Sequence, residues 1–168
     1  MDRASPAATK PRAQPSLKTQ ALKWLANREH SRRELRTKLL RVTAADQAAD
    51  DGTAVSQIDT LLDQLAAQGL LSEHRFVESR LHARQARFGN RRIELELRQH
   101  GVAADAQQLQ QLRATELARA REVWRKKFGV PATDAAARAR QSRFLSARGF
   151  SSEVIHRVVS NHQDTESI

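Results

Sequence analysis

Arginines recur at helical spacing in the middle of the chain. Arg80, Arg84 and Arg87 lie at positions i, i+4 and i+7, so a helix would present all three on one face. The same group continues past Gly89 with Arg91 and Arg92. A guanidinium group binds carboxylates and phosphates through paired N–H donors, so the pattern predicts a surface for an anionic partner. A solvated polar face is the alternative, but Glu78 is the only acid nearby on the same predicted helix.

Two further basic groups have the same chemistry. The first surrounds a predicted helix corner and comprises Arg28, Arg32, Arg33, Arg36 and Lys38. The second follows Trp124 and comprises Arg125, Lys126 and Lys127. We expect Trp124 to lie in the core. Trp24 falls off the apolar stripe of its predicted helix, so it fits either a partly exposed anchor or the edge of a core.

Catalytic and metal-binding patterns are missing from the sequence. The six histidines are scattered, and neither the two-histidine zinc pattern nor a phosphate-binding glycine loop or nucleophile elbow occurs. The absence of cysteine excludes disulfides and thiolate metal sites and suits a reducing cytosol. We therefore expect a binding protein rather than an enzyme, with no cofactor and no metal.

The composition predicts an all-α fold. Helix-forming residues dominate, while aromatic residues make up 4% of the 168 residues and tyrosine is absent. No apolar run is long enough to span a membrane, and the first residues lack an apolar stretch that could serve as a secretory signal. The formal net charge of +10 favours an anionic partner, either nucleic acid or an acidic protein surface.

A repeated corner divides the predicted helices. A leucine is followed four residues later by a glycine and then by an apolar residue, at Leu65-Gly69-Leu70, Leu97-Gly101-Val102 and Leu145-Gly149-Phe150. Glycine can adopt the left-handed conformation that ends a helix, and the apolar residue packs back on the helix end. Ser31 with Glu34 predicts a capping box, and Ser72, Asp105, Asp134 and Ser151 are further predicted caps.

Grouped by threes, the predicted helices form three units over residues 17–69, 72–112 and 113–162. Residues 1–16 read as a disordered basic arm and residues 163–168 as a disordered tail. Residues 43–52 read as a polar loop, and one helix is expected to run from Ser72 to Phe88.

Charge alternates along the chain. Residues 17–41 hold eight Lys or Arg against two acids, whereas residues 42–73 hold six acids and neither Lys nor Arg. Residues 74–100 hold seven Arg against three acids, and residues 113–148 hold ten Lys or Arg against three acids. One face of the molecule could therefore be basic and another acidic.

Three stretches resemble the RecX family, regulators of the RecA recombinase. The first is ALKWLANREHSRRELRTKLL at residues 21–40, and the second is GLLSEHRFVESRLHARQARFGNRRIELELRQHGV at residues 69–102. The third is RFLSARGFSSEVIHRVV at residues 143–159. They occur in the family's order. The corner at Gly89 lacks the second Gly or the Pro of many relatives, and Ser-Glu-His precedes Arg75 where an acidic pair is common.

The resemblance implies tandem three-helix repeats in an elongated, curved array with right-angle corners. It also implies a cytoplasmic protein that binds the RecA–single-stranded DNA filament and inhibits its ATPase, strand-exchange and co-protease activities. We expect this protein to be a monomer. Such a protein would modulate recombination, DNA repair and the SOS response, and it would have no catalytic residues.

Two other functions remain open. A plain DNA-binding module would bind single- or double-stranded DNA with strong salt dependence and without any recombinase. A helical adaptor would bind some other protein.

Overall fold

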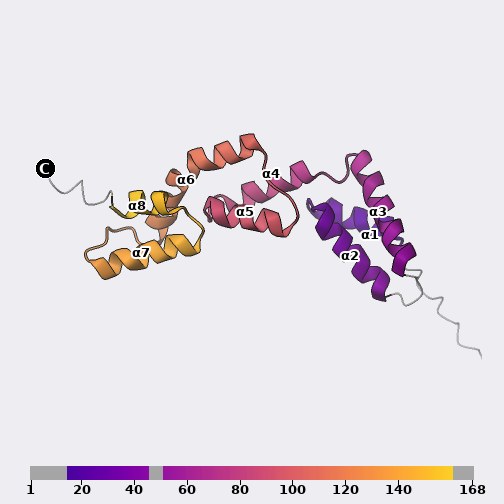
Figure 1. The fold of residues 1–168 in the computed structure, drawn as a ribbon, viewed down its shortest axis with the longest axis horizontal. Coiled ribbons are helices and arrows are strands. Elements are labelled where there is room, and N and C mark those ends of the chain that lie inside the picture. The colour runs from indigo at the N-terminus through magenta and orange to yellow at the C-terminus, as the bar shows by residue number, and fades with distance from the viewer. Residues whose placement is uncertain (1–14, 46–50, 161–168) are drawn as a thin grey trace, which may run out of the picture.

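The computed structural model describes residues 15–45 and 51–160, and this part of the chain contains eight α-helices and no strand. The helices are α1 (Leu17–Asn27), α2 (Arg32–Ala45), α3 (Asp51–Ala67), α4 (Glu73–Arg84), α5 (Asn90–Gln99), α6 (Ala106–Lys127), α7 (Ala135–Ala147) and α8 (Ser152–Ser160). The all-α prediction is confirmed. Figure 1 shows the helices in three groups that follow one another along the longest axis, so the described part is elongated.

Side-chain caps begin most of the helices. Ser72 accepts the amide N–H of Arg75, and Asp134 accepts that of Ala137. Asp105 forms a full capping box with Gln108, because each residue's side chain accepts the other's amide N–H. These bonds satisfy first-turn N–H groups that have no partner inside the helix. The expected caps at these positions are therefore present.

The repeated corner has the predicted backbone. Gly69, Gly101 and Gly149 have φ values of 69°, 75° and 83°, all in the left-handed region. In each corner the glycine N–H bonds the carbonyl oxygen three residues back, and the next N–H bonds the carbonyl of the leucine. Val102 and Phe150 are buried as expected, but Leu70 is 43% exposed and Leu71 is buried in its place. In the first corner, the buried apolar residue therefore stands two positions after the glycine instead of one.

Three separate cores hold the helices together. The N-terminal core contains Leu35, Leu39 and Ile58 among others and is formed by α1, α2 and α3. The middle core contains Phe76, Ile93 and Leu97, and the C-terminal core contains Trp124, Leu145 and Phe150. Each core is formed by helices that are neighbours in the sequence. The three cores therefore follow one another in chain order, which gives the elongated shape.

Helix α6 belongs to two of these cores. Leu112, near its beginning, lies in the middle core, whereas Ala120 and Trp124, near its end, lie in the C-terminal core. The expected boundary between residues 112 and 113 falls inside this unbroken helix. The two cores therefore share one rigid element.

Several local expectations were wrong. Both ends of the predicted loop at 43–52 are helical, because α2 continues to Ala45 and α3 begins at Asp51. Helix α4 ends at Arg84 rather than at Phe88. Ser31 accepts the N–H of Glu34, but the Glu34 carboxylate bonds Arg28 instead of completing the capping box. The predicted arm and tail lie almost entirely outside the described residues.

Candidate functional site

Three guanidinium groups surround the half-buried ring of Phe88. The Cζ atoms of Arg84, Arg87 and Arg92 lie 5.6, 5.8 and 4.8 Å from its centroid. A cation is attracted to the negative face of an aromatic ring, so the ring holds these side chains close to one another. The structure therefore brings three arginines of the predicted surface together around Phe88. The sequence predicted a helical position for Phe88 but no role in this surface.

An acid outside their own helix partly neutralises these arginines. Glu96 of α5 accepts a hydrogen bond from Arg84 Nε at 2.8 Å, and Arg92 Nε lies 3.8 Å from the same carboxylate. Arg87 follows the end of α4 and, like Arg91, forms no ion pair within the described residues. The acid comes from the next helix, so spacing along α4 alone could not show it.

Arg80 lies apart from the Phe88 ring. Its guanidinium Cζ lies 5.3 Å from the centroid of Phe76, and its Nη2 lies 3.4 Å from Nε2 of His100. Burial lowers the pKa of His100, and the positive charge of Arg80 lowers it further. Arg80 is therefore tied to the end of α5 rather than to the other predicted arginines.

The middle and C-terminal cores meet at two glycines, a contact we call the joint. The N–H of Gly89 donates to the carbonyl oxygen of Arg148 at 2.9 Å, and the N–H of Arg91 donates to that of Gly149 at 3.1 Å. A Cβ atom on Gly89 would lie 2.3 Å from the Gly149 backbone, which no real side chain could do. Glycine is required here because two backbone segments touch.

A buried carboxylate crosses the joint. Glu116 of α6 is 6% exposed and accepts hydrogen bonds from the N–H of Asn90 at 3.1 Å and from the hydroxyl of Ser151 at 3.2 Å. It binds the first turn of α5, where a negative charge is favourable. Ser151 was expected to cap α8, but its hydroxyl bonds Glu116 instead.

Arg119 completes the joint from the next turn of α6. Its guanidinium donates to the carbonyl oxygens of Gln85, Phe88 and Leu112 and to the side chain of Asn90. Burial lowers its pKa, although an arginine remains charged in a protein. Arg119 therefore ties the turn between α4 and α5 to α6, as Glu116 does from the neighbouring turn of that helix.

A basic depression of about 310 Å³ lies beside the joint. Four cations line it, and these are Arg87, Lys126, Lys127 and Arg148. Its other lining residues are apolar: Ala86, Val123 and Phe144. We call this feature the joint depression. It unites one arginine of the first predicted group with two lysines of the third.

Arg148 was missed by the sequence analysis. Its guanidinium Cζ lies 4.6 Å from the centroid of Phe144, and its Nη1 donates to the carbonyl oxygen of Arg87 at 3.3 Å. The only local signal was its place before Gly149 in the repeated corner. Nothing along the chain connects it with Arg87, which lies 61 residues earlier.

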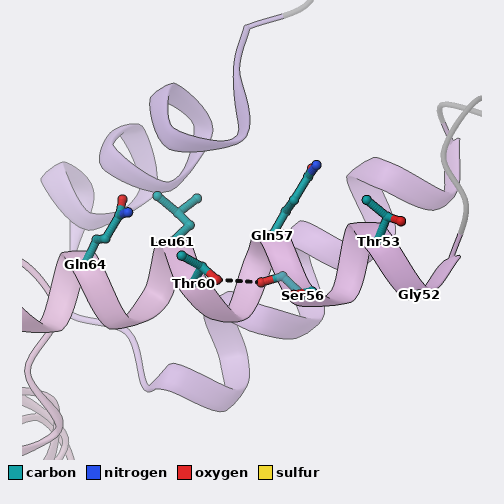
Figure 2. Close-up of a pocket in the computed structure, with 7 residues that line it drawn as sticks. All are labelled: Gly52, Thr53, Ser56, Gln57, Thr60, Leu61 and Gln64. Carbon is teal, nitrogen blue, oxygen red and sulfur yellow. Dashed lines mark hydrogen bonds between the residues drawn. The ribbon is translucent and has the colours of Figure 1, made fainter.

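A larger depression, of about 540 Å³, lies over α3 and has different chemistry. Figure 2 shows that all seven of its lining residues come from that one helix, and none carries a charge. Among the described residues, no three His, Cys, Asp or Glu side chains gather as metal ligands. None of the described helices is long and apolar enough to cross a membrane. The basic groups are therefore the strongest candidates for a site.

The first basic group is largely neutralised by acids of its own unit. Arg36 Nε donates to Asp59 at 2.7 Å, and Arg32 Nη1 lies 2.7 Å from Asp63. Arg28 pairs with Glu34. The basic block at 17–41 thus faces part of the acidic block at 42–73 across the contact between α2 and α3.

Two members of this group have other contacts. Lys38 Nζ donates to His30 Nε2 at 2.9 Å and lies 5.3 Å from the Trp24 centroid. Arg33 packs against Gly101, where an added Cβ would lie 3.3 Å from its Cδ. Trp24 is half-buried at the edge of the N-terminal core. This position agrees with the prediction of a core edge rather than an exposed anchor.

The third basic group contains both paired and unpaired cations. Arg125 donates to Glu122 at 2.9 Å and Lys126 Nζ lies 3.1 Å from it, and these hydrogen bonds lower the pKa of Glu122 to about 2. Lys127 forms no ion pair in the described part of the chain. Trp124 is buried as expected, and its ring N–H donates to Gln141 at 2.9 Å.

Comparison with known proteins gives consistent matches. Residues 72–108 match a family model described as "RecX, second three-helix domain", and residues 114–159 match "RecX, third three-helix domain". "Regulatory protein RecX" of Leptothrix cholodnii is 51% identical over 150 residues, which cover 88% of this chain and 90% of that protein. The protein of the same name from Herminiimonas arsenicoxydans is 46% identical and covers 91% and 97%.

The fold has solved relatives. The crystal structure of RecX from Lactobacillus salivarius superposes with a TM-score of 0.62 and covers 88% of this chain and 94% of that one. Their sequence identity is 16%, so this likeness concerns the fold alone. It agrees with the three-helix domains of the family models.

Proposed function

The chain belongs to the RecX family of regulatory proteins, and we propose that it is a negative regulator of the RecA recombinase. In this proposal it binds the RecA–single-stranded DNA filament in the cytoplasm and inhibits ATP hydrolysis, strand exchange and co-protease activity. It acts by occupying the filament, not by catalysing a reaction. Recombination, DNA repair and the SOS response would be restrained as a result.

One observation carries the proposal at the level of residues. Near the joint, Arg87, Arg91, Lys127 and Arg148 form no ion pair within the described residues, whereas their neighbours Arg84, Arg92, Arg125 and Lys126 do. An unpaired cation can contact a carboxylate or phosphate of a partner without first losing an internal partner. The joint is therefore the part of the proposed interface that we expect to matter most.

The elongated arrangement supports binding to a long partner. The three groups of helices follow one another along the longest axis (Figure 1), and each group contains basic residues, so several contacts can form at once along a filament. Each contact tethers the next, so overall affinity exceeds that of any single contact. The other members of the three predicted groups remain in the proposed interface, but Arg32, Arg36 and Arg84 would have to share their guanidinium groups with internal carboxylates.

The test is a titration of recombinase ATPase activity on single-stranded DNA, beside DNA binding by this chain alone. We expect inhibition at concentrations well below those that bind DNA. Full ATPase activity at saturating chain would contradict the proposal.

Charge reversals locate the surface. Arg87→Glu is expected to weaken inhibition at least tenfold, as is the triple reversal of Arg80, Arg84 and Arg87, because attraction becomes repulsion. Arg121→Glu is the matched control, since Arg121 is exposed on α6 and does not line the joint depression. Equal effects of Arg87→Glu and Arg121→Glu would remove the joint from the interface.

Binding to DNA without a recombinase is the second candidate. The unpaired cations of the joint depression favour it, because phosphates are natural partners for them. It predicts that inhibition, where seen, begins only at concentrations that coat the DNA.

A further inference from the structure

We propose that the joint depression is a binding site for the phosphodiester backbone of single-stranded DNA. The inference rests on the proposed function for the choice of DNA as the anion, and it assigns this contact to one place on the chain. It leaves the rest of the elongated surface for the recombinase.

The first argument is charge from several elements. Arg87 follows α4, Lys126 and Lys127 end α6, and Arg148 follows α7. Cations far apart in the sequence therefore line one depression of about 310 Å³. None of its lining residues is acidic. Several cations around one hollow bind an anion more strongly than the same number along one helix face, because all of them can approach the same charge.

The second argument is that the guanidinium groups are held in place. Arg148 stacks over Phe144 and donates one hydrogen bond to the Arg87 carbonyl, which leaves other N–H donors free. Arg87 lies over the ring of Phe88, and that turn is fixed by Arg119. Side chains that are already ordered lose less conformational entropy when a ligand binds.

The third argument is the apolar lining. Ala86, Val123 and Phe144 also line the depression and give it an apolar part that a sugar or an unstacked base could contact. A single strand presents those groups beside its phosphates, whereas a duplex keeps its bases stacked inside. Sites for single strands combine positive charge with such surfaces, so this lining favours single-stranded DNA over duplex.

The joint keeps these groups in register. Gly89 and Gly149 are in direct backbone contact, and Glu116 bonds both sides of the joint. The cations from the two sides therefore stay at fixed separations when the chain is free.

The experiment measures binding of a fluorescent oligothymidylate to the full chain without recombinase, over a range of salt concentrations. The test variant is Lys127→Gln with Arg148→Gln. Loss of two phosphate contacts should make the slope of log affinity against log salt shallower by about 1.4. At 0.1 M salt this corresponds to binding about 25-fold weaker, if affinities converge at 1 M. The matched control is Arg113→Gln with Arg121→Gln, two exposed arginines of α6 outside the depression.

Two further variants keep the test independent of folding. Lys127→Gln alone changes an exposed side chain that has no hydrogen bond or ion pair within the described residues, and it should give half the change in slope. Glu122→Gln removes the acid beside Lys126 and should tighten binding several-fold. Equal losses in the test and control pairs would overturn the site, as would unchanged binding after Glu122→Gln.

The nature of the anion and the proposed function are tested separately. Duplex DNA and polyglutamate serve as competitors, and displacement by polyglutamate as effective as by the oligonucleotide would overturn a phosphate site. Recombinase ATPase inhibition is measured with the same variants. A chain that binds oligothymidylate through the depression but never inhibits the ATPase would retain this site and refute the proposed function.

Discussion

Gly89 and Gly149 lie in backbone contact across 60 residues of chain, so that a Cβ atom on Gly89 would stand 2.3 Å from the Gly149 carbonyl. The φ of Gly89 is −78°, which any residue can adopt. Glycine is needed there for space alone. Gly69 is the opposite case, because its φ is +69° and no atom lies within 4 Å of its added Cβ.

Gly89→Ala is therefore expected to open the joint. The atoms in the way belong to the backbone, so the structure would have to shift, at a cost of about 3 kcal/mol. Gly69→Ala should cost about 1–2 kcal/mol through its left-handed backbone and leave the joint closed. Urea unfolding gives the stabilities, and hydrogen exchange at the amides of Gly89 and Arg91 reports the joint. Slow exchange at both amides in Gly89→Ala would contradict this explanation.

Glu116→Gln should destabilise the chain by about 1–2 kcal/mol, because an amide replaces one of the two carboxylate oxygens that accept from Asn90 and Ser151. The control is Glu94→Gln, which changes a carboxylate that has no hydrogen bond or ion pair within the described residues. Thermal unfolding followed by circular dichroism compares the two. Similar melting temperatures for both variants would mean that the hydrogen bonds from Asn90 and Ser151 to the Glu116 carboxylate add nothing to the stability of the fold.

The buried ring of His30 should make the free energy of unfolding depend on pH. Its ring is 2% exposed, and Nδ1 lies 2.9 Å from the Arg28 carbonyl oxygen while Lys38 Nζ lies 2.9 Å from Nε2. A carbonyl only accepts and an ammonium only donates, so these contacts fit a neutral ring with its proton on Nδ1. Burial lowers the pKa of His30, and the nearby Arg28 and Lys38 charges lower it further, against the raising effects of the hydrogen bond to the Arg28 backbone and of the Glu34 charge.

The sign of the effect follows from proton binding. Below about pH 6.5 the unfolded chain takes up a proton that folded His30 resists, so stability should fall as the pH drops below that value. His30→Gln should reduce this slope, and His100, whose pKa is also lowered, should supply part of the remainder. Exposed His156→Gln is the control. An unchanged slope between pH 7.5 and 5.5 in His30→Gln would count against the neutral buried ring.

Asp59 and Asp63 are expected to limit binding to nucleic acid. They pair with Arg36 and Arg32, so Asp59→Asn with Asp63→Asn would free two cations of α2. DNA binding should then strengthen, with a salt slope steeper by about 1.4 on a single strand. Folding should change little, since exposed ion pairs contribute little to stability. Glu94→Gln with Glu153→Gln is the control, and equal gains in both double variants would show a general charge effect only.

Local features of the fold were accessible from the sequence. The corners at Gly69, Gly101 and Gly149 and the caps at Ser72 and Asp105 depend on residues a few positions apart, and their chemistry is fixed by the backbone of a helix end. The family resemblance was carried by the same stretches. Helix ends without such a signal, as at residues 43–52, were placed less well.

Contacts between helices were not accessible in the same way. The bond from Arg36 to Asp59 joins positions 23 residues apart, and that from Arg148 to Arg87 joins positions 61 apart. Such pairs depend on the angle at which helices cross, which charge and spacing along one helix do not determine. The same holds for Glu96, which changes the charge around Arg84 from a neighbouring helix.

Helix α6 fixes how two parts of this molecule are turned relative to each other. Each residue of an α-helix adds about 100° of rotation and about 1.5 Å of rise. A single residue inserted between Leu112 and Ala120 would therefore rotate the C-terminal core by about 100° around the helix axis, away from Gly89. The number of residues in this segment therefore sets the angle about the helix axis between the middle and C-terminal cores, and insertions or deletions can change that angle only in steps of about 100°.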